Sequence, residues 1–88
     1  MNINGTYIMR EIVGEYVLVP VEDTALAFSG IISLNEVGAA IWKGLEAGLD
    51  REGLLQKLLE EFDVSEQEAR TDLEEFLQML LQNKLITE

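Results

Sequence analysis

The side chains that could do chemistry in this sequence are almost all carboxylates. The chain has no Cys and no His, which excludes thiolate nucleophiles, disulfides, Cys- or His-bound metals and the usual proton carrier at neutral pH. Between residues 60 and 75, eight acidic residues stand against one basic residue, Arg70. Such carboxylates can bind Ca²⁺ or Mg²⁺, but the alternating ligands and central glycine of an EF-hand loop are missing. We interpret this run as a solvated face, with docking of a basic patch on an enzyme as the alternative.

Length and net charge narrow the function classes further. The 88 residues suffice for one small domain, residues 1–88. Six Lys and Arg against seventeen Asp and Glu give a net charge of −11, which repels phosphate backbones and anionic lipids. We therefore expect no nucleic-acid partner and no membrane partner. The sequence also lacks a secretory signal and an apolar run of ~18 residues, so a soluble cytoplasmic protein is expected.

The first third of the chain has the composition of β-strands. Residues 7–13 and 16–20 are rich in β-branched and aromatic side chains, and the two-residue gap between them predicts a hairpin loop at Gly14 and Glu15. Residues 21–27 have no clear period and are expected to form a loop. Residues 28–34 have a period of two, which predicts a third, half-buried strand. One face of this strand carries Phe28, Gly30, Ile32 and Leu34, and the other carries Ser29, Ile31 and Ser33.

The rest of the chain has three helix start signals. Asn35 and Asp50 are favoured N-cap residues, and Ser65 with Glu68 forms a capping box. Gly48 is a stop signal for the first helix. The predicted helices follow these three caps and end near residues 48, 62 and 83, and an extended tail is expected at residues 85–86.

Three strands followed by three helices form an α+β order that fits a winged helix-turn-helix-like domain. A DNA-binding winged helix normally carries Lys and Arg on its recognition helix, whereas the third predicted helix has only Arg70 among many acids. An acyl carrier protein needs an Asp-Ser-Leu triplet, and Ser33 is preceded by Ile32. Both alternatives are therefore disfavoured.

Two longer segments and a closing residue pair carry a resemblance to a known family. Residues 30–42 (GIISLNEVGAAIW), residues 72–77 (DLEEFL) and the closing Leu85-Ile86 resemble the PqqD family, named for pyrroloquinoline quinone biosynthesis protein D. Members of this family are the stand-alone form of the precursor-peptide recognition element in ribosomal peptide modification. The resemblance covers about residues 7–86. It implies a non-catalytic, winged-helix-like peptide chaperone without cofactor, metal site or catalytic residue, which presents a precursor peptide to a modifying enzyme, often a radical S-adenosylmethionine (SAM) protein.

The resemblance also implies where the leader of the precursor peptide binds. The leader adds as a strand beside residues 28–33 and lies against the third helix. An unpaired strand edge can also pair with its own copy, so a homo-oligomeric scaffold, such as a homodimer built on the same edge, is the alternative function. Burial in the core is the alternative for each apolar side chain of the implied site. The implied peptide-binding residues are Phe28, Ser29, Gly30, Ile31, Ile32, Ser33, Arg70, Leu73, Phe76 and Leu77.

Overall fold

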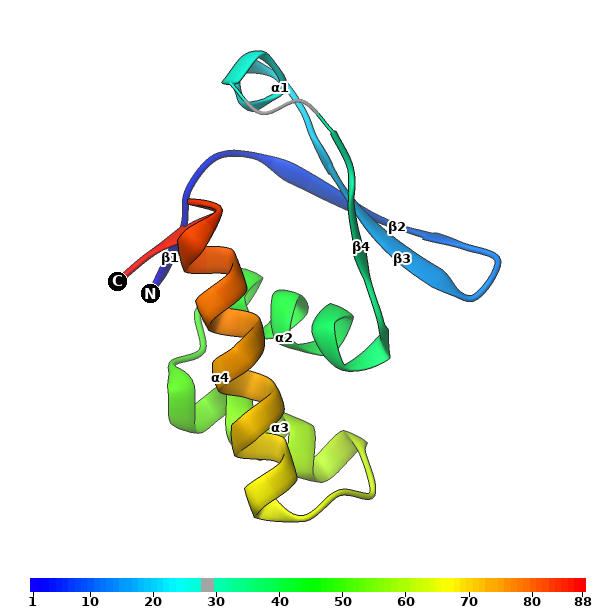
Figure 1. The fold of residues 1–88 in the computed structure, drawn as a ribbon, viewed down its shortest axis with the longest axis vertical. Coiled ribbons are helices and arrows are strands. Elements are labelled where there is room, and N and C mark those ends of the chain that lie inside the picture. The colour runs from blue at the N-terminus through cyan, green and yellow to red at the C-terminus, as the bar shows by residue number, and fades with distance from the viewer. Residues whose placement is uncertain (28–29) are drawn as a thin grey trace.

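The chain folds into a three-stranded antiparallel sheet beside three long helices, and a computed structural model describes residues 1–27 and 30–88 of it (Figure 1). The sheet has the order β2-β3-β4, and the chain termini pair as a separate two-stranded sheet, β1-β5. This architecture confirms the predicted α+β class with an antiparallel sheet ahead of the helices. The elements are β1 (Asn2–Ile3), β2 (Tyr7–Ile12), β3 (Glu15–Pro20), α1 (Asp23–Ala27), β4 (Ile32–Leu34), α2 (Glu36–Glu46), α3 (Arg51–Glu61), α4 (Glu66–Gln82) and β5 (Ile86–Thr87).

The hairpin loop between β2 and β3 lies one residue earlier than predicted. Ile12 pairs with Glu15, so the two loop residues are Val13 and Gly14. Their φ angles are 47° and 80°, and positive φ at both central positions is the pattern of a type I′ turn. Gly14 occupies the second of these positions, where glycine adopts a positive φ without strain. In the predicted loop, Gly14 was the first of the two residues. Val13 adopts a conformation that β-branched residues rarely take, and its side chain is 98% exposed.

The third strand of the sheet is shorter than predicted. Residues 28–34 were expected to be extended, but β4 covers only Ile32–Leu34, and residues 28–29 lie outside the described part of the chain. The register Leu18↔Ile32 places Pro20 opposite Gly30, where Pro20 has no N–H to donate. Gly30 has φ 130°, which an extended strand does not use. Both features end the strand. The expected loop at residues 21–27 also proved partly wrong, because it contains the short helix α1.

All three predicted helix caps are present in the structure. The Asn35 side chain accepts a hydrogen bond from the Gly38 N–H at 2.8 Å, Asp50 accepts one from Gly53 at 2.9 Å, and Ser65 accepts one from the Glu68 N–H at 3.1 Å. Each bond satisfies a backbone donor that the first helical turn leaves unpaired. The helices α2, α3 and α4 therefore begin where the sequence predicted.

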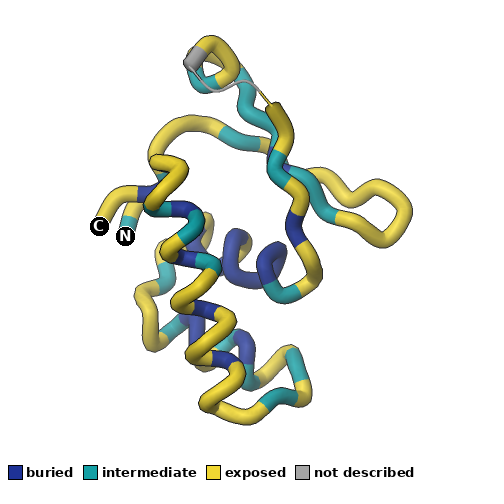
Figure 2. The backbone as a smooth tube through the Cα atoms, in the orientation of Figure 1, coloured by how far each residue is buried: buried dark blue, intermediate teal, exposed yellow. Residues whose placement is uncertain are grey.

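The core lies where α2, α3 and α4 face one another and where α2 packs on the sheet (Figure 2). Trp42 of α2 is 1% exposed and meets the Tyr7 ring edge to face, with ring centroids 5.6 Å apart. The sequence pattern predicts seven buried side chains, of which Ile32, Phe62 and Phe76 are only half-buried, whereas the other four are buried: Leu34, Ile41, Leu45 and Leu58. The extended tail is confirmed, since β5 pairs with β1 and both Leu85 and Ile86 are buried. No helix in residues 1–27 and 30–88 is long and apolar enough to cross a membrane.

The crossing of α2 and α3 depends on Gly44. A Cβ atom at this position would lie 2.5 Å from a methyl carbon of the fully buried Leu54. We expect Gly44→Val to lower the free energy of unfolding by about 1–3 kcal/mol, because the core must move to admit it. Urea denaturation measures this loss. The matched variant Glu46→Val puts the same side chain on an exposed position of α2, so equal losses in the two variants would contradict the argument.

Candidate functional site

The outer edge of β4 is open, because in the described part of the chain β4 pairs only with β3. The register of the sheet shows which backbone groups point to this edge. The Val21 N–H donates to the Thr6 carbonyl at 3.0 Å, in line with the β2–β3 register. Hydrogen-bonded pairs alternate with non-bonded pairs along an antiparallel ladder. Counted from Thr6 and Val21, the odd-numbered residues of β3 bond to β2, so its even-numbered residues bond to β4.

The open groups on β4 follow from this alternation. The even-numbered residues of β3 pair with Ile32 and Leu34, whose N–H and C=O groups therefore point inward to β3. The N–H and C=O of Ser33 point to the open edge, and we expect those of Ile31, the residue directly before β4, to follow the same alternation. Both residues are exposed, with Ile31 at 63%. The edge thus offers two donors and two acceptors at the spacing that an added antiparallel strand requires.

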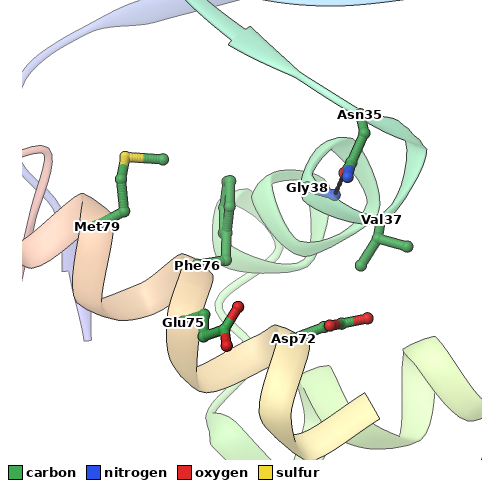
Figure 3. A pocket seen from close by; sticks show the side chains of 7 residues that line it. All are labelled: Asn35, Val37, Gly38, Asp72, Glu75, Phe76 and Met79. Atoms are coloured by element: carbon green, nitrogen blue, oxygen red, sulfur yellow. Dashed lines mark hydrogen bonds between the residues drawn. The ribbon is translucent and has the colours of Figure 1, made fainter. Parts of the chain in front are cut away.

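A pocket of about 320 Å³ lies next to the end of β4, between the first turn of α2 and one side of α4. Figure 3 shows the side chains of Phe76 and Met79 pointing away from α4, to the side on which β4 lies. Val37 lines the pocket from the first turn of α2. These three half-buried side chains make the apolar part of the pocket. The lining is Asn35, Val37, Gly38, Asp72, Glu75, Phe76 and Met79. The volume suits one large side chain or a short segment of peptide.

Gly38 allows the Phe76 ring to lie against α2. A Cβ atom at Gly38 would come within 2.9 Å of the Phe76 Cε1 atom, closer than real Cβ contacts. The Gly38 N–H is also the donor to the Asn35 cap, so the same turn of α2 starts the helix and forms the pocket wall. The pocket therefore depends on how β4 joins α2.

The charged groups at the pocket are all negative. Asp72 and Glu75 lie on its rim, whereas none of the six Lys and Arg of the chain lines it. Within residues 1–27 and 30–88, no group of three His, Cys, Asp or Glu side chains is placed to hold a metal ion. The arrangement thus combines open backbone groups, an apolar hollow and a negative rim. Open backbone groups beside an apolar hollow are the features by which proteins in general bind an extended peptide.

The structure separates the implied site residues into two sets. Ile32 and Ser33 lie in β4, Gly30 and Ile31 lie directly before it, and Phe76 lines the pocket, while Phe28 and Ser29 fall outside the described residues.

The other three implied residues lie elsewhere on α4. Leu73 and Leu77 are 3% and 0% exposed, because they pack in the core between the helices. Arg70 bonds to Glu66 at 3.2 Å and pairs with Glu52 of α3 at 3.6 Å, so it is directed toward α3. Leu73 and Leu77 therefore belong to the core and Arg70 faces α3, whereas the resemblance had implied that all three residues contact the peptide.

Phe76 is the one pocket-lining residue that the sequence analysis had included in the implied site. The six residues that it missed are Asn35, Val37, Gly38, Asp72, Glu75 and Met79, of which Asn35 had been predicted only as a helix cap. Met79 lies three residues after Phe76 on α4, and that helical spacing was the signal that could have placed both on one face.

Comparisons with known proteins give two matches. Residues 15–86 match the family model described as coenzyme PQQ synthesis protein D (PqqD). A solved structure, described as TbiB1 in complex with the TbiA(beta) leader peptide, matches with a TM-score of 0.75 at 27% sequence identity. The match covers 97% of this chain and 93% of that chain. No curated protein matches this sequence.

Proposed function

The chain belongs to the PqqD family, and from this premise we propose that it binds the leader of a ribosomally made precursor peptide. The leader adds as an antiparallel strand to the open edge of β4 and places a side chain in the pocket between α2 and α4. Strand addition is a general mode of peptide recognition, in which backbone hydrogen bonds give affinity and side-chain pockets give specificity. The resemblance to a structure that holds a leader peptide supports the proposal.

The observation that carries the proposal is the position of the pocket at the end of the open strand. The pocket begins at Asn35, the residue that directly follows β4. A strand paired to β4 lies about 4.8 Å from it, on the side of the molecule where α4 lies in Figure 1. Alternate side chains of that strand then face Phe76 and Met79 of α4.

The expected affinity is moderate. The four open groups of Ile31 and Ser33 contribute about 1 kcal/mol of net stabilisation each, and about three buried leader side chains contribute about 2–3 kcal/mol each. Ordering of a flexible leader costs about 2–5 kcal/mol. After a further cost of association, a net binding free energy of about 6–9 kcal/mol remains, which corresponds to a Kd between tens of micromolar and sub-micromolar. This range suits a protein that must release its cargo.

The test is a titration of the protein with a fluorescein-labelled leader peptide, followed by anisotropy. Candidate leaders are the N-terminal segments of any short precursor genes found by searching the neighbourhood of the gene of this chain. Saturable binding in the stated range that is competed by unlabelled leader supports the proposal. A scrambled leader of equal composition is the control, and equal binding of the two peptides would count against it.

We further propose that the bound leader is presented to a peptide-modifying enzyme of the radical SAM class, as the resemblance to the family implies. The second candidate function is self-association, because the same open edge of β4 can pair with a second copy. Sedimentation of the protein with and without leader separates the two. A dimer that the leader does not dissociate favours the scaffold.

The isolated protein is expected to perform no chemistry on the precursor. Its carboxylates are exposed, and the sequence has neither His nor Cys to act as nucleophile or proton carrier. Mass spectrometry of the precursor after incubation with the protein alone should give the unmodified mass. Calorimetry should give no stoichiometric zinc binding. A mass change, or tight zinc binding, would contradict this expectation.

A further inference from the structure

The side of α4 that borders the pocket carries a row of carboxylates. Glu68, Asp72 and Glu75 follow one another at steps of four and three residues, which places them on one face of the helix. Asp72 also lines a second hollow on α4, to which Glu68 belongs, so this carboxylate borders both hollows. We call Glu68, Asp72 and Glu75 the acidic rim.

In the described part of the chain, no Lys or Arg forms an ion pair with the acidic rim. The ion pairs among the described residues involve Arg51, Lys57 and Arg70, and none of them includes a rim carboxylate. Arg70, the one basic residue of α4, forms ion pairs with Glu66 and Glu52.

The rim and the apolar pocket together define what the site can accept. A leader strand beside β4 passes the apolar side chains of Phe76 and Met79, and carboxylates flank Phe76 on the same helix at Asp72 and Glu75. An acidic leader side chain there would meet like charges on a protein whose net charge is already −11. A Lys or Arg there would pair with carboxylates that have no other partner among the described residues.

We propose that this site selects leader segments in which a Lys or Arg lies within two residues of the apolar side chain that enters the pocket. This inference rests on the proposed leader binding and adds the chemistry of the ligand. The basic side chain pairs with Asp72 or Glu75 at the rim, while the apolar one contacts Phe76. The rim thus rejects acidic segments and admits basic ones.

The experiment uses a phage library of random 12-residue peptides, selected on the immobilised protein at 50 mM salt. We expect Lys or Arg to be enriched within two positions of an aromatic or large aliphatic residue. The best peptide, labelled with fluorescein, is then titrated against Asp72→Asn/Glu75→Gln. Binding should weaken about fivefold to tenfold, and the difference should shrink at 500 mM salt because exposed ion pairs are screened.

A matched variant controls for the loss of net charge. Glu46→Gln/Glu60→Gln removes two exposed carboxylates that do not line the pocket, and it should bind within about twofold of the wild type. Selection without enrichment of Lys or Arg overturns the proposal. So does equal weakening by the rim and control variants.

The variant Ser33→Pro distinguishes a failure of the acidic rim from a failure of strand addition at β4. Selected peptides without basic residues that bind the wild type but not Ser33→Pro overturn the rim and leave strand addition standing. Peptides that bind both proteins equally, or a selection that yields no binder, overturn both.

Discussion

Replacing Ser33 with proline is expected to remove leader binding and leave the domain folded. The Ser33 N–H points to the open edge of β4, so its loss breaks no bond within the sheet. It leaves a carbonyl of the leader strand without a donor, which costs about 1–3 kcal/mol or roughly tenfold to a hundredfold in Kd. Titration of labelled leader into Ser33→Pro measures the loss, and circular dichroism checks the fold.

Variants at Ile31, Ile32 and Ser33 are the controls for Ser33→Pro. Ile32→Pro removes an N–H that points to β3, so it should destabilise the sheet itself by about 1–3 kcal/mol. Ser33→Ala keeps the backbone donor and should bind nearly as well as the wild type. Ile31→Pro, at the next open position, should resemble Ser33→Pro. If the folded Ser33→Pro and Ile31→Pro proteins bind leader normally, strand addition at β4 is wrong.

Two adjacent residues of α4 should give opposite results when each is changed to aspartate. Leu77 is fully buried in the core, and a carboxylate there should cost more than about 5 kcal/mol, comparable with the whole stability of a small domain. Leu77→Asp should therefore unfold the protein. Phe76 is half-buried and lines the pocket, so Phe76→Asp should stay folded and weaken leader binding by tenfold or more.

Thermal unfolding and leader titration of the two variants separate the roles. Met79→Asp is the second pocket variant, since Met79 is also half-buried and serves if Phe76→Asp proves unstable. A folded Leu77→Asp protein would show that the helix packing is misassigned. Unimpaired binding by folded Phe76→Asp and Met79→Asp proteins would show that the leader does not use the pocket.

The elements whose signals are local could be predicted from the sequence. The side chains of Asn35, Asp50 and Ser65 cap the helices as expected, because a cap depends on residues only three positions apart. The family was also predicted, since the match over residues 15–86 includes both segments that carried the resemblance.

The features that depend on pairing between distant residues could not be predicted. The start of β4 depends on Pro20. This residue lies opposite Gly30 only once the register between β3 and β4 is fixed. The hairpin loop moved by one residue for a similar reason, because Gly14 fits two turn types at two positions. Such offsets decide which backbone groups of β4 are open.

The candidate site was predicted in part, because an apolar helix stripe does not show which of its members face a ligand. The stripe on α4 is wide enough to include Leu73 and Leu77, which are in the core, as well as Phe76, which is in the pocket. Only the packing of α4 on α2 and α3 separates them. Val37 joins the pocket from α2, which no spacing within α4 could indicate.

Amide hydrogen exchange measured by NMR tests strand addition at β4 most directly. In the free protein the Ile32 and Leu34 amides, which bond to β3, should exchange slowly, and the outward Ser33 amide should exchange fast. Saturating leader peptide should slow the exchange of the Ser33 amide at least about tenfold, because it then donates to the added strand. Unchanged exchange at Ser33 in the presence of bound leader, or new protection along the outer edge of β2, would contradict the account.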